Sequence, residues 1–233
     1  GADVHPYETK RGGDGTRQAR KAVERGADVV IAAGGDGTIH EVAQALYGNR
    51  VQLGIFPLGT ANVLAIELGL LSKSPRHWVA HITNGHTRSI YPAFAGEQLF
   101  VMMAGCGFDA DVVQHVSTRI KRVMGKGAYV LSALWLFIKG HHQTYTVETA
   151  EQTYACGGAI ATLGRHYAGP FVIAERAAID KAELALLLLP AGGRWQTFKG
   201  MLALPLNRLH KVKGATTVAA QSASFMAPAG AAL

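Results

Sequence analysis

Two copies of the pentapeptide Gly-Gly-Asp-Gly-Thr occur in this chain, and the second is placed where it could do chemistry. It follows a short apolar run and consists of Gly34, Gly35, Asp36, Gly37 and Thr38. A glycine-rich turn between a buried strand and a helix leaves backbone N–H groups unpaired and lets a phosphate approach beside the positive end of the helix dipole. Asp36 is then placed to act on Mg²⁺ or on an attacking hydroxyl. The alternative is a tight turn in which Asp36 only caps the helix.

The first copy, residues 12–16, lacks this setting. It follows the polar residues 7–11, so no buried strand presents it at the carboxyl edge of a sheet. We interpret it as a surface turn in which Thr16 caps the next helix.

A further turn, residues 57–62, contains Gly59, Thr60 and Asn62 and follows the next apolar run. Because the carboxyl ends of parallel strands meet at one edge of a sheet, both turns are expected to open there, where ligands of open α/β sheets bind. The alternative is an ordinary strand-to-helix turn with Asn62 as a cap.

The elements that must position these turns follow from the apolar pattern. Residues 27–33 form an apolar run without polar alternation, which is typical of a central parallel strand buried on both faces. Apolar residues in the next segments recur at helical spacing. The pattern predicts strands at 3–7, 27–33 and 51–56 and helices at 16–25, 39–46 and 63–68. We therefore expect a parallel sheet with helices on its faces.

The second part of the chain has a different pattern, with several short strands and few crossovers. We expect strands at 87–92, 99–104, 144–149, 158–163 and 184–189, and one helix at 117–139. This favours an antiparallel β-sandwich. The predicted fold class is α/β, with a parallel-sheet nucleotide-binding domain over residues 1–86 and a mostly antiparallel β-sandwich domain over residues 87–233.

Composition restricts the class of protein. Hydrophobic residues at 48% and charged residues at 17% exclude a disordered chain, and two cysteines are too few for a disulfide scaffold. The net charge, 23 − 16 = +7, favours anionic partners, but the chain has no zinc-finger spacing, basic heptads or aromatic-basic RNA signature, so nucleic acid is not among them. With no signal pattern and no apolar run near the ~20 residues of a membrane span, we expect a cytoplasmic protein.

Residues 34–42 and 53–65 together resemble the diacylglycerol kinase catalytic domain family, which includes bacterial lipid kinases and sphingosine kinases. Residues 105–112 resemble the family's next glycine-rich signature, and residues 167–180 resemble the stretch before its catalytic acidic residue. These landmarks occur in the family's order over most of the chain.

The resemblance implies ATP-dependent, Mg²⁺-assisted phosphorylation of the hydroxyl of diacylglycerol or a related lipid. Asp109 and Asp111 would contact the lipid head group or a metal, or would only cap a turn. The residues implied to hold ATP are Thr9, Gly34, Gly35, Asp36, Gly37, Thr38, Gly59, Thr60 and Asn62.

The resemblance leaves two candidate catalytic aspartates, Asp36 and Asp180. Asp36 matches its motif, whereas the later Asp-Gly-Leu site reads Asp180-Lys181-Ala182, with Lys181 at the usual aspartate position. A one-residue offset at a strand edge turns a side chain to the other face. Asp180 is therefore a candidate, and a strand-end turn residue is its alternative.

The chain also lacks three family features: the opening strand, the Asn-Pro-x-Ser-Gly loop and a C-terminal Asp-Gly-Glu. We expect that the sequence omits these pieces. A divergent, impaired kinase is the alternative. Two rival functions stay open, NAD kinase and a catalytically impaired nucleotide-binding regulatory protein.

The expected partners are the lipid substrate and an anionic membrane surface at the inner face of the membrane. A basic cluster beside the apolar residues 129–138 predicts a membrane-surface helix, with a core helix as the alternative. A homodimer is left open. The cluster consists of Arg119, Lys121, Arg122 and Lys126.

Overall fold

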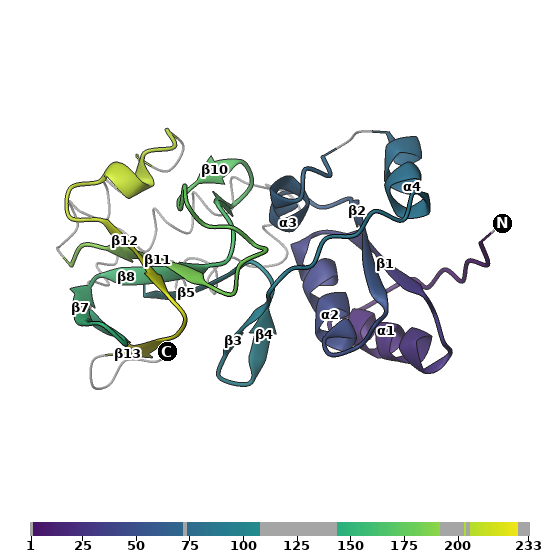
Figure 1. The fold of residues 1–233 in the computed structure, drawn as a ribbon, viewed down its shortest axis with the longest axis horizontal. Coiled ribbons are helices and arrows are strands. Elements are labelled where there is room, and N and C mark those ends of the chain that lie inside the picture. The colour runs from purple at the N-terminus through teal and green to yellow at the C-terminus, as the bar shows by residue number, and fades with distance from the viewer. Residues whose placement is uncertain (1, 72–73, 108–143, 192–202, 204–205, 228–233) are drawn as a thin grey trace.

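The computed structural model describes residues 2–71, 74–107, 144–191, 203 and 206–227. Figure 1 shows two groups of elements side by side along the long axis. Helices and two strands from residues 14–83 form one group, and the antiparallel strands from residue 103 onward form the other.

A parallel strand pair lies at the centre of the first group. Strand β1 (Val29–Gly34) pairs with β2 (Gln52–Pro57), with Val30 opposite Leu53 and Ala33 opposite Phe56. This confirms the predicted parallel sheet, and each of its strands leads into a helix. The helices of this group are α1 (Asp14–Glu24), α2 (Asp36–Leu46), α3 (Val63–Glu67) and α4 (Pro75–Thr83).

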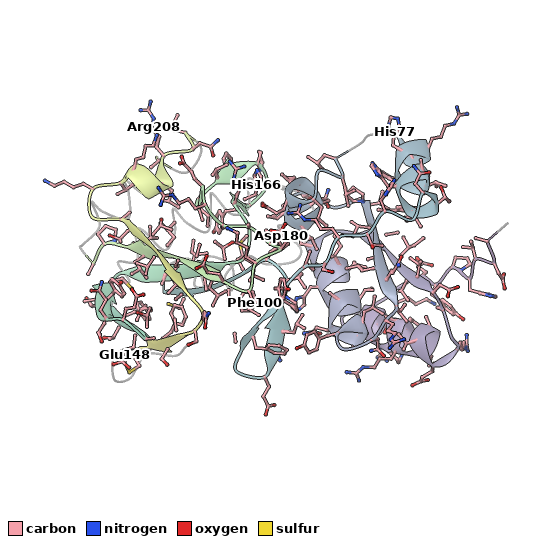
Figure 2. The ribbon with its side chains drawn as sticks, in the orientation of Figure 1. His77, Phe100, Glu148, His166, Asp180 and Arg208 are labelled. Atoms are coloured by element: carbon pink, nitrogen blue, oxygen red, sulfur yellow. The ribbon has the colours of Figure 1, made fainter. Side chains whose placement is uncertain are left out.

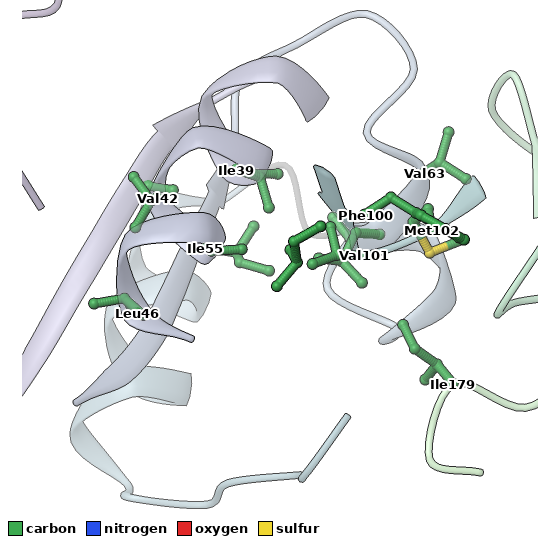
Figure 3. Packing of buried hydrophobic residues seen from close by; sticks show 14 of the residues in the cluster. Ile39, Val42, Leu46, Ile55, Val63, Phe100, Val101, Met102 and Ile179 are labelled. Atoms are coloured by element: carbon green, nitrogen blue, oxygen red, sulfur yellow. The ribbon is translucent and has the colours of Figure 1, made fainter. Parts of the chain in front are cut away.

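The core of this group is built on the apolar stripe of α2. Ile39, Val42 and Leu46 recur at helical spacing and are buried against Ile55 of β2. The same cluster takes in Ile179 and residues 99–102, which come from beyond the expected boundary at residue 86. Figure 3 shows Phe100 and Val101 beside Ile55 of β2, whereas Ile179 lies at the far side of the same cluster. One core cluster therefore includes residues of both groups, and the division at 86 and 87 stays a prediction.

Two antiparallel sheets form the second group. A four-stranded sheet has the order β12-β11-β8-β5, and a three-stranded sheet has the order β13-β6-β7. The strands are β5 (Met103–Gly107), β6 (Tyr145–Thr149), β7 (Thr153–Cys156), β8 (Gly158–Thr162), β11 (Leu184–Leu189), β12 (Thr216–Ala220) and β13 (Ala223–Met226). Successive residues of β11 point to opposite faces, as the period of a strand requires. Leu186 and Leu188 pack against Val147 of the smaller sheet, which confirms the expected sandwich-like pair of sheets.

The other face of β11 supports a layer of loops. Leu187 packs with Ile160, Ile173 and Leu209 in a separate buried cluster. The short elements of the structure are β3 (Ala93–Ala95), β4 (Gln98–Phe100), β9 (His166–Tyr167), β10 (Phe171–Val172) and the 3₁₀ turn η1 (Leu209–Lys211).

Three strand predictions were wrong. Residues 3–7 form no strand, and the whole segment 2–13 is exposed, without a pairing partner. Residues 87–92 form no strand. Their one described backbone hydrogen bond to another segment runs from the Tyr91 N–H to the Ile179 carbonyl at 3.0 Å. Residues 99–104 belong to two different sheets, since β4 pairs with β3 and β5 pairs with β8. The helix expected at 117–139 lies outside the described residues.

Within the described part of the chain, no helix has the length and hydropathy that crossing a membrane requires.

Candidate functional site

The two predicted turns begin at the same edge of the sheet. Gly34 at the end of β1 lies opposite Pro57 at the end of β2. The Leu58 N–H donates to the Gly34 carbonyl at 2.9 Å, so the strands stay paired to their last residues. The strands before the two turns therefore end at the same carboxyl edge of the sheet, as the sequence predicts.

The turns also touch through two glycines. A Cβ added at Gly59 would lie 2.3 Å from the Cα of Gly35, and one added at Gly35 would lie 3.1 Å from the Cα of Gly59. The neighbouring atom is a backbone Cα in both cases, and it cannot move away from an added Cβ as the end of a flexible side chain can. Gly35 and Gly59 are therefore required by the contact between the two turns.

Asp36, in the turn 34–38, binds the first residue of α3, which follows the turn 57–62. Its Oδ1 accepts a hydrogen bond from the Val63 N–H at 2.7 Å, across 27 positions of the sequence. Asp36 thus caps α3 rather than its own helix, because α2 has Gly35 as N-cap and no side-chain cap. The structure describes no hydrogen bond to Oδ2, the other oxygen of this carboxylate.

The beginning of α2 presents open backbone donors. Helix N-termini leave their first N–H groups without intrahelical partners. For residues 35–38, the described hydrogen bonds include none donated by these N–H groups. Gly37 is exposed, and a Cβ added there would meet nothing within 4 Å. Gly34 instead makes room for Thr38, whose Oγ1 would lie 2.6 Å from an added Cβ.

Asn62 shapes its own turn. Its backbone is left-handed, with φ of 50°, and its side chain is buried. The side-chain Oδ1 accepts from the Gly59 N–H at 2.9 Å, and Nδ2 donates to the carbonyls of Gly59 at 2.7 Å and Pro57 at 3.3 Å. The neighbouring Thr60 is exposed. Asn62 therefore holds the backbone that reaches Gly35.

Asp180 lies between the two groups of elements, as Figure 2 shows. Its Oδ2 forms an ion pair with Arg88 Nη2 at 2.6 Å, and both side chains are about half exposed, at 44% and 51%. The hydrogen bond from Arg88 holds the pKa of Asp180 below its ordinary value. Lys181, which the sequence resemblance places at the family's usual aspartate position, is exposed.

The first Gly-Gly-Asp-Gly-Thr copy differs in part from the prediction. Gly12 and Gly13 form an exposed turn, as predicted, but α1 begins at Asp14 with Gly13 as its N-cap, and Asp14 and Gly15 are buried. Thr16 does not cap this helix, because its Oγ1 donates to the Glu41 carbonyl at 2.9 Å.

Glu41 of α2 is the reason for this arrangement. Its Oε1 accepts from the Gly13 N–H at 2.9 Å and its Oε2 from the Gly15 N–H at 2.8 Å. A carboxylate at a helix N-terminus is stabilised by the helix dipole as well as by these donors. The chain thus supplies its own anion to the beginning of α1.

Asp14 folds back on the residues before it. Its Oδ2 accepts from the N–H groups of Lys10 at 2.9 Å and Arg11 at 3.2 Å, and its Oδ1 pairs with Arg17 Nη2 at 2.9 Å. The Lys10 N–H is the largest cause that lowers the pKa of Asp14, and Arg11 and Arg17 add to it against the effect of burial.

Sequence reasoning missed a contact between the two groups. Glu67, at the end of α3, has a side chain only 7% exposed. Its Oε2 contacts His166 Nδ1 at 2.6 Å and accepts from the N–H groups of Arg165 at 3.0 Å and His166 at 3.2 Å. A carboxylate inside an otherwise apolar helical run was the available signal.

Some predicted residues have no described place at the site. Thr9 is exposed in the irregular segment 2–13, and no described contact joins it to either turn. Asp109 and Asp111 lie outside the described residues, and so does the basic cluster with Arg119, Lys121, Arg122 and Lys126. Of the described residues, no three His, Cys, Asp or Glu side chains gather as ligands for a metal ion.

Comparison with known proteins gives the class. Residues 1–93, which contain both turns, match the model of the diacylglycerol kinase catalytic domain. Over this segment the chain is similar to the diacylglycerol kinase catalytic domain family.

Curated relatives are similar over longer stretches. A YegS-like lipid kinase of Pseudomonas putida is 32% identical over 189 residues, which are 78% of this chain and 63% of that protein. A diacylglycerol kinase of Bacillus subtilis is 35% identical over 136 residues, 58% of this chain and 45% of the relative. The chain thus spans less than two thirds of the length of these relatives.

A solved structure shares the fold. The crystal structure of a diacylglycerol kinase from Bacillus anthracis superposes with a TM-score of 0.73 at 23% sequence identity, covering 97% of this chain and 75% of that one. The fold is therefore that of diacylglycerol kinases, with a parallel sheet first and antiparallel sheets after it.

Proposed function

We propose that this protein is an ATP-dependent lipid kinase that transfers the γ-phosphoryl group of ATP to the hydroxyl of diacylglycerol or a related lipid. The observation that carries the proposal is the open beginning of α2. The N–H groups of residues 35–38 have no described acceptor there, and the turn 57–62 lies next to them. Such a helix N-terminus binds phosphate through its donors and its dipole. The family match and the relatives' names support a kinase with a lipid acceptor.

In this proposal the two turns bind the nucleotide phosphates by different means. Residues 34–38 donate backbone N–H groups, and the exposed Gly37 leaves space for close approach. Gly59 and Thr60 form the opposite wall, while Asn62 fixes the shape of that wall. No described contact supports Thr9 in this role, so it remains a prediction.

Mg²⁺ fits this site as an ion held mainly by the nucleotide. Mg²⁺ commonly binds through one or two carboxylates together with substrate phosphates, and Asp36 Oδ2 is a carboxylate oxygen with no described hydrogen bond. When bound there, Mg²⁺ would offset negative charge on the transferring phosphoryl group. The bond from Val63 to Oδ1 fixes the orientation in which Asp36 offers Oδ2.

The geometry favours Asp36 over Asp180 as the principal acidic residue. Asp36 is fixed between the two turns, whereas Asp180 is paired with Arg88, which lowers its pKa and makes it a weaker base. We propose that Asp36 orients the reacting groups and that Asp180 contributes less. Because the acceptor is a membrane lipid, we further propose that the protein acts at the cytoplasmic face of a membrane.

The test compares the two identical pentapeptides. ADP release with Mg-ATP is measured in parallel with diacylglycerol micelles, sphingosine and NAD, for the wild type, Asp36→Asn and Asp14→Asn. Asn at position 36 keeps an oxygen that can accept from Val63 but loses the charge. We expect diacylglycerol-dependent turnover that falls at least ~100-fold in Asp36→Asn and stays near wild type in Asp14→Asn.

Other outcomes decide between the rivals. Turnover that depends on NAD would move the protein to the NAD kinases. Bound ATP with no turnover on any acceptor would favour the regulatory protein. The variant Asp180→Asn, assayed alongside, measures the contribution of the second aspartate, which we expect to be several-fold.

A further inference from the structure

Glu67 is a buried carboxylate at the end of a helix that otherwise buries apolar side chains. Leu64 and Ala65 of α3 are buried in the core cluster, whereas Glu67 brings a negative charge to a side chain that is only 7% exposed. A carboxylate is costly to bury unless it is hydrogen-bonded, and the C-terminal end of a helix disfavours negative charge. A position that bears both costs indicates a role that an apolar residue could not fill.

Three donors of one loop converge on a single oxygen of this carboxylate. Oε2 accepts from the N–H groups of Arg165 at 3.0 Å and His166 at 3.2 Å, and it contacts His166 Nδ1 at 2.6 Å. An ionised carboxylate only accepts hydrogen bonds, so Nδ1 is the ring nitrogen that carries the hydrogen. Hydrogen bonds to a charged acceptor are roughly twice as strong as neutral ones. Glu67 therefore holds the first residue of β9 by its backbone and its side chain together.

The loop before β9 has the space that Glu67 needs. A Cβ added at Gly164 would lie 2.9 Å from Glu67 Cδ and 2.8 Å from Met102 Cε. On the other side of the loop, the buried Thr162 Oγ1 donates to the Gly164 carbonyl at 2.8 Å. The Leu163 N–H donates to the Met102 carbonyl at 2.8 Å. The carboxylate thus fits into a loop whose backbone is already fixed by its own hydrogen bonds.

Helix α3 connects this contact to the turn 34–38. Its first residue, Val63, donates its N–H to Asp36 Oδ1 at 2.7 Å, and its last residue is Glu67. At ~1.5 Å of rise per residue, the two ends of α3 lie about 6 Å apart. A displacement of Glu67 is therefore transmitted to the carboxylate of Asp36 over about one turn of helix.

The loop that Glu67 binds leads to the other candidate aspartate. After β10 the chain returns to this loop, where the Ile173 N–H donates to the Arg165 carbonyl at 2.9 Å. From Ile173 the chain continues directly to Asp180. Glu67 thus joins the helix that binds Asp36 to the segment that ends at Asp180.

We propose that Glu67 is a positioning residue, which fixes the segment ending at Asp180 relative to the turn that contains Asp36. Its contact with His166 crosses from the first group of elements to the second, and Figure 2 shows His166 and Asp180 along the boundary where the groups meet. The proposal rests on the proposed lipid kinase function, in which phosphoryl donor and acceptor must be aligned. A misplacement of about 1 Å in such a reaction can cost about 100-fold in rate.

The first test separates the rate of turnover from nucleotide binding. For the wild type, Glu67→Gln and Gly164→Ala, kcat is measured with Mg-ATP and diacylglycerol micelles, and the affinity and stoichiometry of ATP binding are measured by calorimetry. Gln keeps one acceptor oxygen but loses the charge, whereas Ala at position 164 displaces the carboxylate without removing it. We expect kcat to fall at least ~10-fold in both variants, with ATP affinity and stoichiometry at their wild-type values.

His166 provides a rescue by a conservative variant. His166→Phe keeps a ring but removes the Nδ1 donor, whereas His166→Asn offers an amide N–H near the same position. We expect kcat to fall in His166→Phe and to stay near the wild-type value in His166→Asn. The matched control is Glu41→Gln, because Glu41 also accepts from two backbone N–H groups but joins elements within the first group only. It should keep the wild-type kcat.

Two outcomes would overturn the positioning role while leaving the kinase intact. One is a wild-type kcat in Glu67→Gln and Gly164→Ala. The other is a kcat that falls only in proportion to the stoichiometry of ATP binding, or equally in Glu41→Gln, because Glu67 would then stabilise the fold and nothing more.

Hydrogen exchange tests the proposal without any turnover. In Glu67→Gln the N–H groups of Arg165 and His166 should exchange faster because their acceptor is weakened, and that of Val63 should follow because α3 shifts. Faster exchange confined to residues 165 and 166 would overturn transmission through α3. Without diacylglycerol-dependent turnover in the wild type, the kinase function fails, and the exchange at Val63 alone decides whether Glu67 positions the turn that contains Asp36.

Discussion

The two Gly-Gly-Asp-Gly-Thr copies have the same residues and opposite hydrogen-bonding states. In the first copy the N–H groups of Gly13 and Gly15 donate to Glu41, and that of Asp14 donates to the Arg11 carbonyl. In the second copy, the N–H groups of residues 35–38 have no described acceptor. Both copies begin a helix of 11 residues, so the difference lies in what surrounds the turn.

The surroundings differ in their strands and in their aspartates. The second copy follows β1 and meets the turn after β2, whereas the first follows an exposed irregular segment. Asp14 binds backward to Lys10 and Arg11, and Asp36 binds forward to Val63 of another helix. The same pentapeptide thus has open backbone donors only where the fold supplies no acceptor for them.

The largest expected effect comes from Gly59→Ala, which would separate the two turns of the second copy. The new Cβ would lie 2.3 Å from the Cα of Gly35 and 2.7 Å from Asn62 Oδ1, so backbone must move. We expect the free energy of unfolding to fall by ~3 kcal/mol or more, measured by urea denaturation. Thr60→Ala, at the exposed next position, is the control. Wild-type stability of Gly59→Ala would disprove the close contact.

The next effect concerns the anion of the first copy. Glu41→Gln replaces one carboxylate oxygen by an NH₂ group that faces the N–H of Gly13 or Gly15. We expect a loss of about 2 kcal/mol in the free energy of unfolding, because a charged acceptor is replaced by a donor. Glu24→Gln, on the exposed side of α1, should change it by less than ~0.5 kcal/mol. Equally small effects in the two variants would show that the hydrogen bonds from Gly13 and Gly15 to Glu41 contribute no stability.

Alanine at the fourth position of each copy should separate them further. In Gly15→Ala the Cβ would lie 2.7 Å from Glu41 Oε2 and would displace the Glu41 carboxylate. In Gly37→Ala the new Cβ meets nothing within 4 Å. We expect Gly15→Ala to lose ~1 kcal/mol of stability and Gly37→Ala to gain up to ~1 kcal/mol from helix propensity. If the proposed phosphate site is correct, ATP affinity should nevertheless fall only in Gly37→Ala, as calorimetry would show.

The smallest expected effect is a pH dependence of the stability that Asp14 of the first copy contributes. Because the pKa of Asp14 is lowered from 3.8 in the folded protein, its contribution to stability is complete above that value. The contribution is lost as pH falls through the lower folded pKa. Urea denaturation at a series of acidic pH values should therefore show a shallower loss of stability in Asp14→Asn than in the wild type. Parallel curves would exclude Asp14 as a contributor.

The elements that carry the second copy could be predicted because local signals agreed. The apolar run before Gly34 and the helical spacing of Ile39, Val42 and Leu46 predicted β1 and α2 to within a few residues. The parallel pairing followed from the repetition of this pattern. Wrong strands arose where an apolar or alternating stretch found no partner, as in residues 3–7 and 87–92.

The side-chain arrangement of the site could not be predicted in the same way. Glu41 reaches back 28 positions to Gly13, and Asp36 reaches forward 27 positions to Val63. Nothing local in the sequence distinguishes these carboxylates from exposed helical ones. Asp180 is similar, because its pairing with Arg88 joins residues 92 positions apart. Long-range contacts of single side chains depend on the fold that brings them together.

The core cluster that includes residues of both groups has a consequence for synthesis of the chain. Ile179, only 1% exposed, and Leu163, 2% exposed, complete the cluster around α2 although they come more than a hundred residues later. A chain emerging from the ribosome at ~5–20 residues per second therefore leaves the part of this cluster that Leu163 and Ile179 complete without these partners for several seconds. During that interval the nascent N-terminal part is a natural client for chaperones that bind exposed apolar surface.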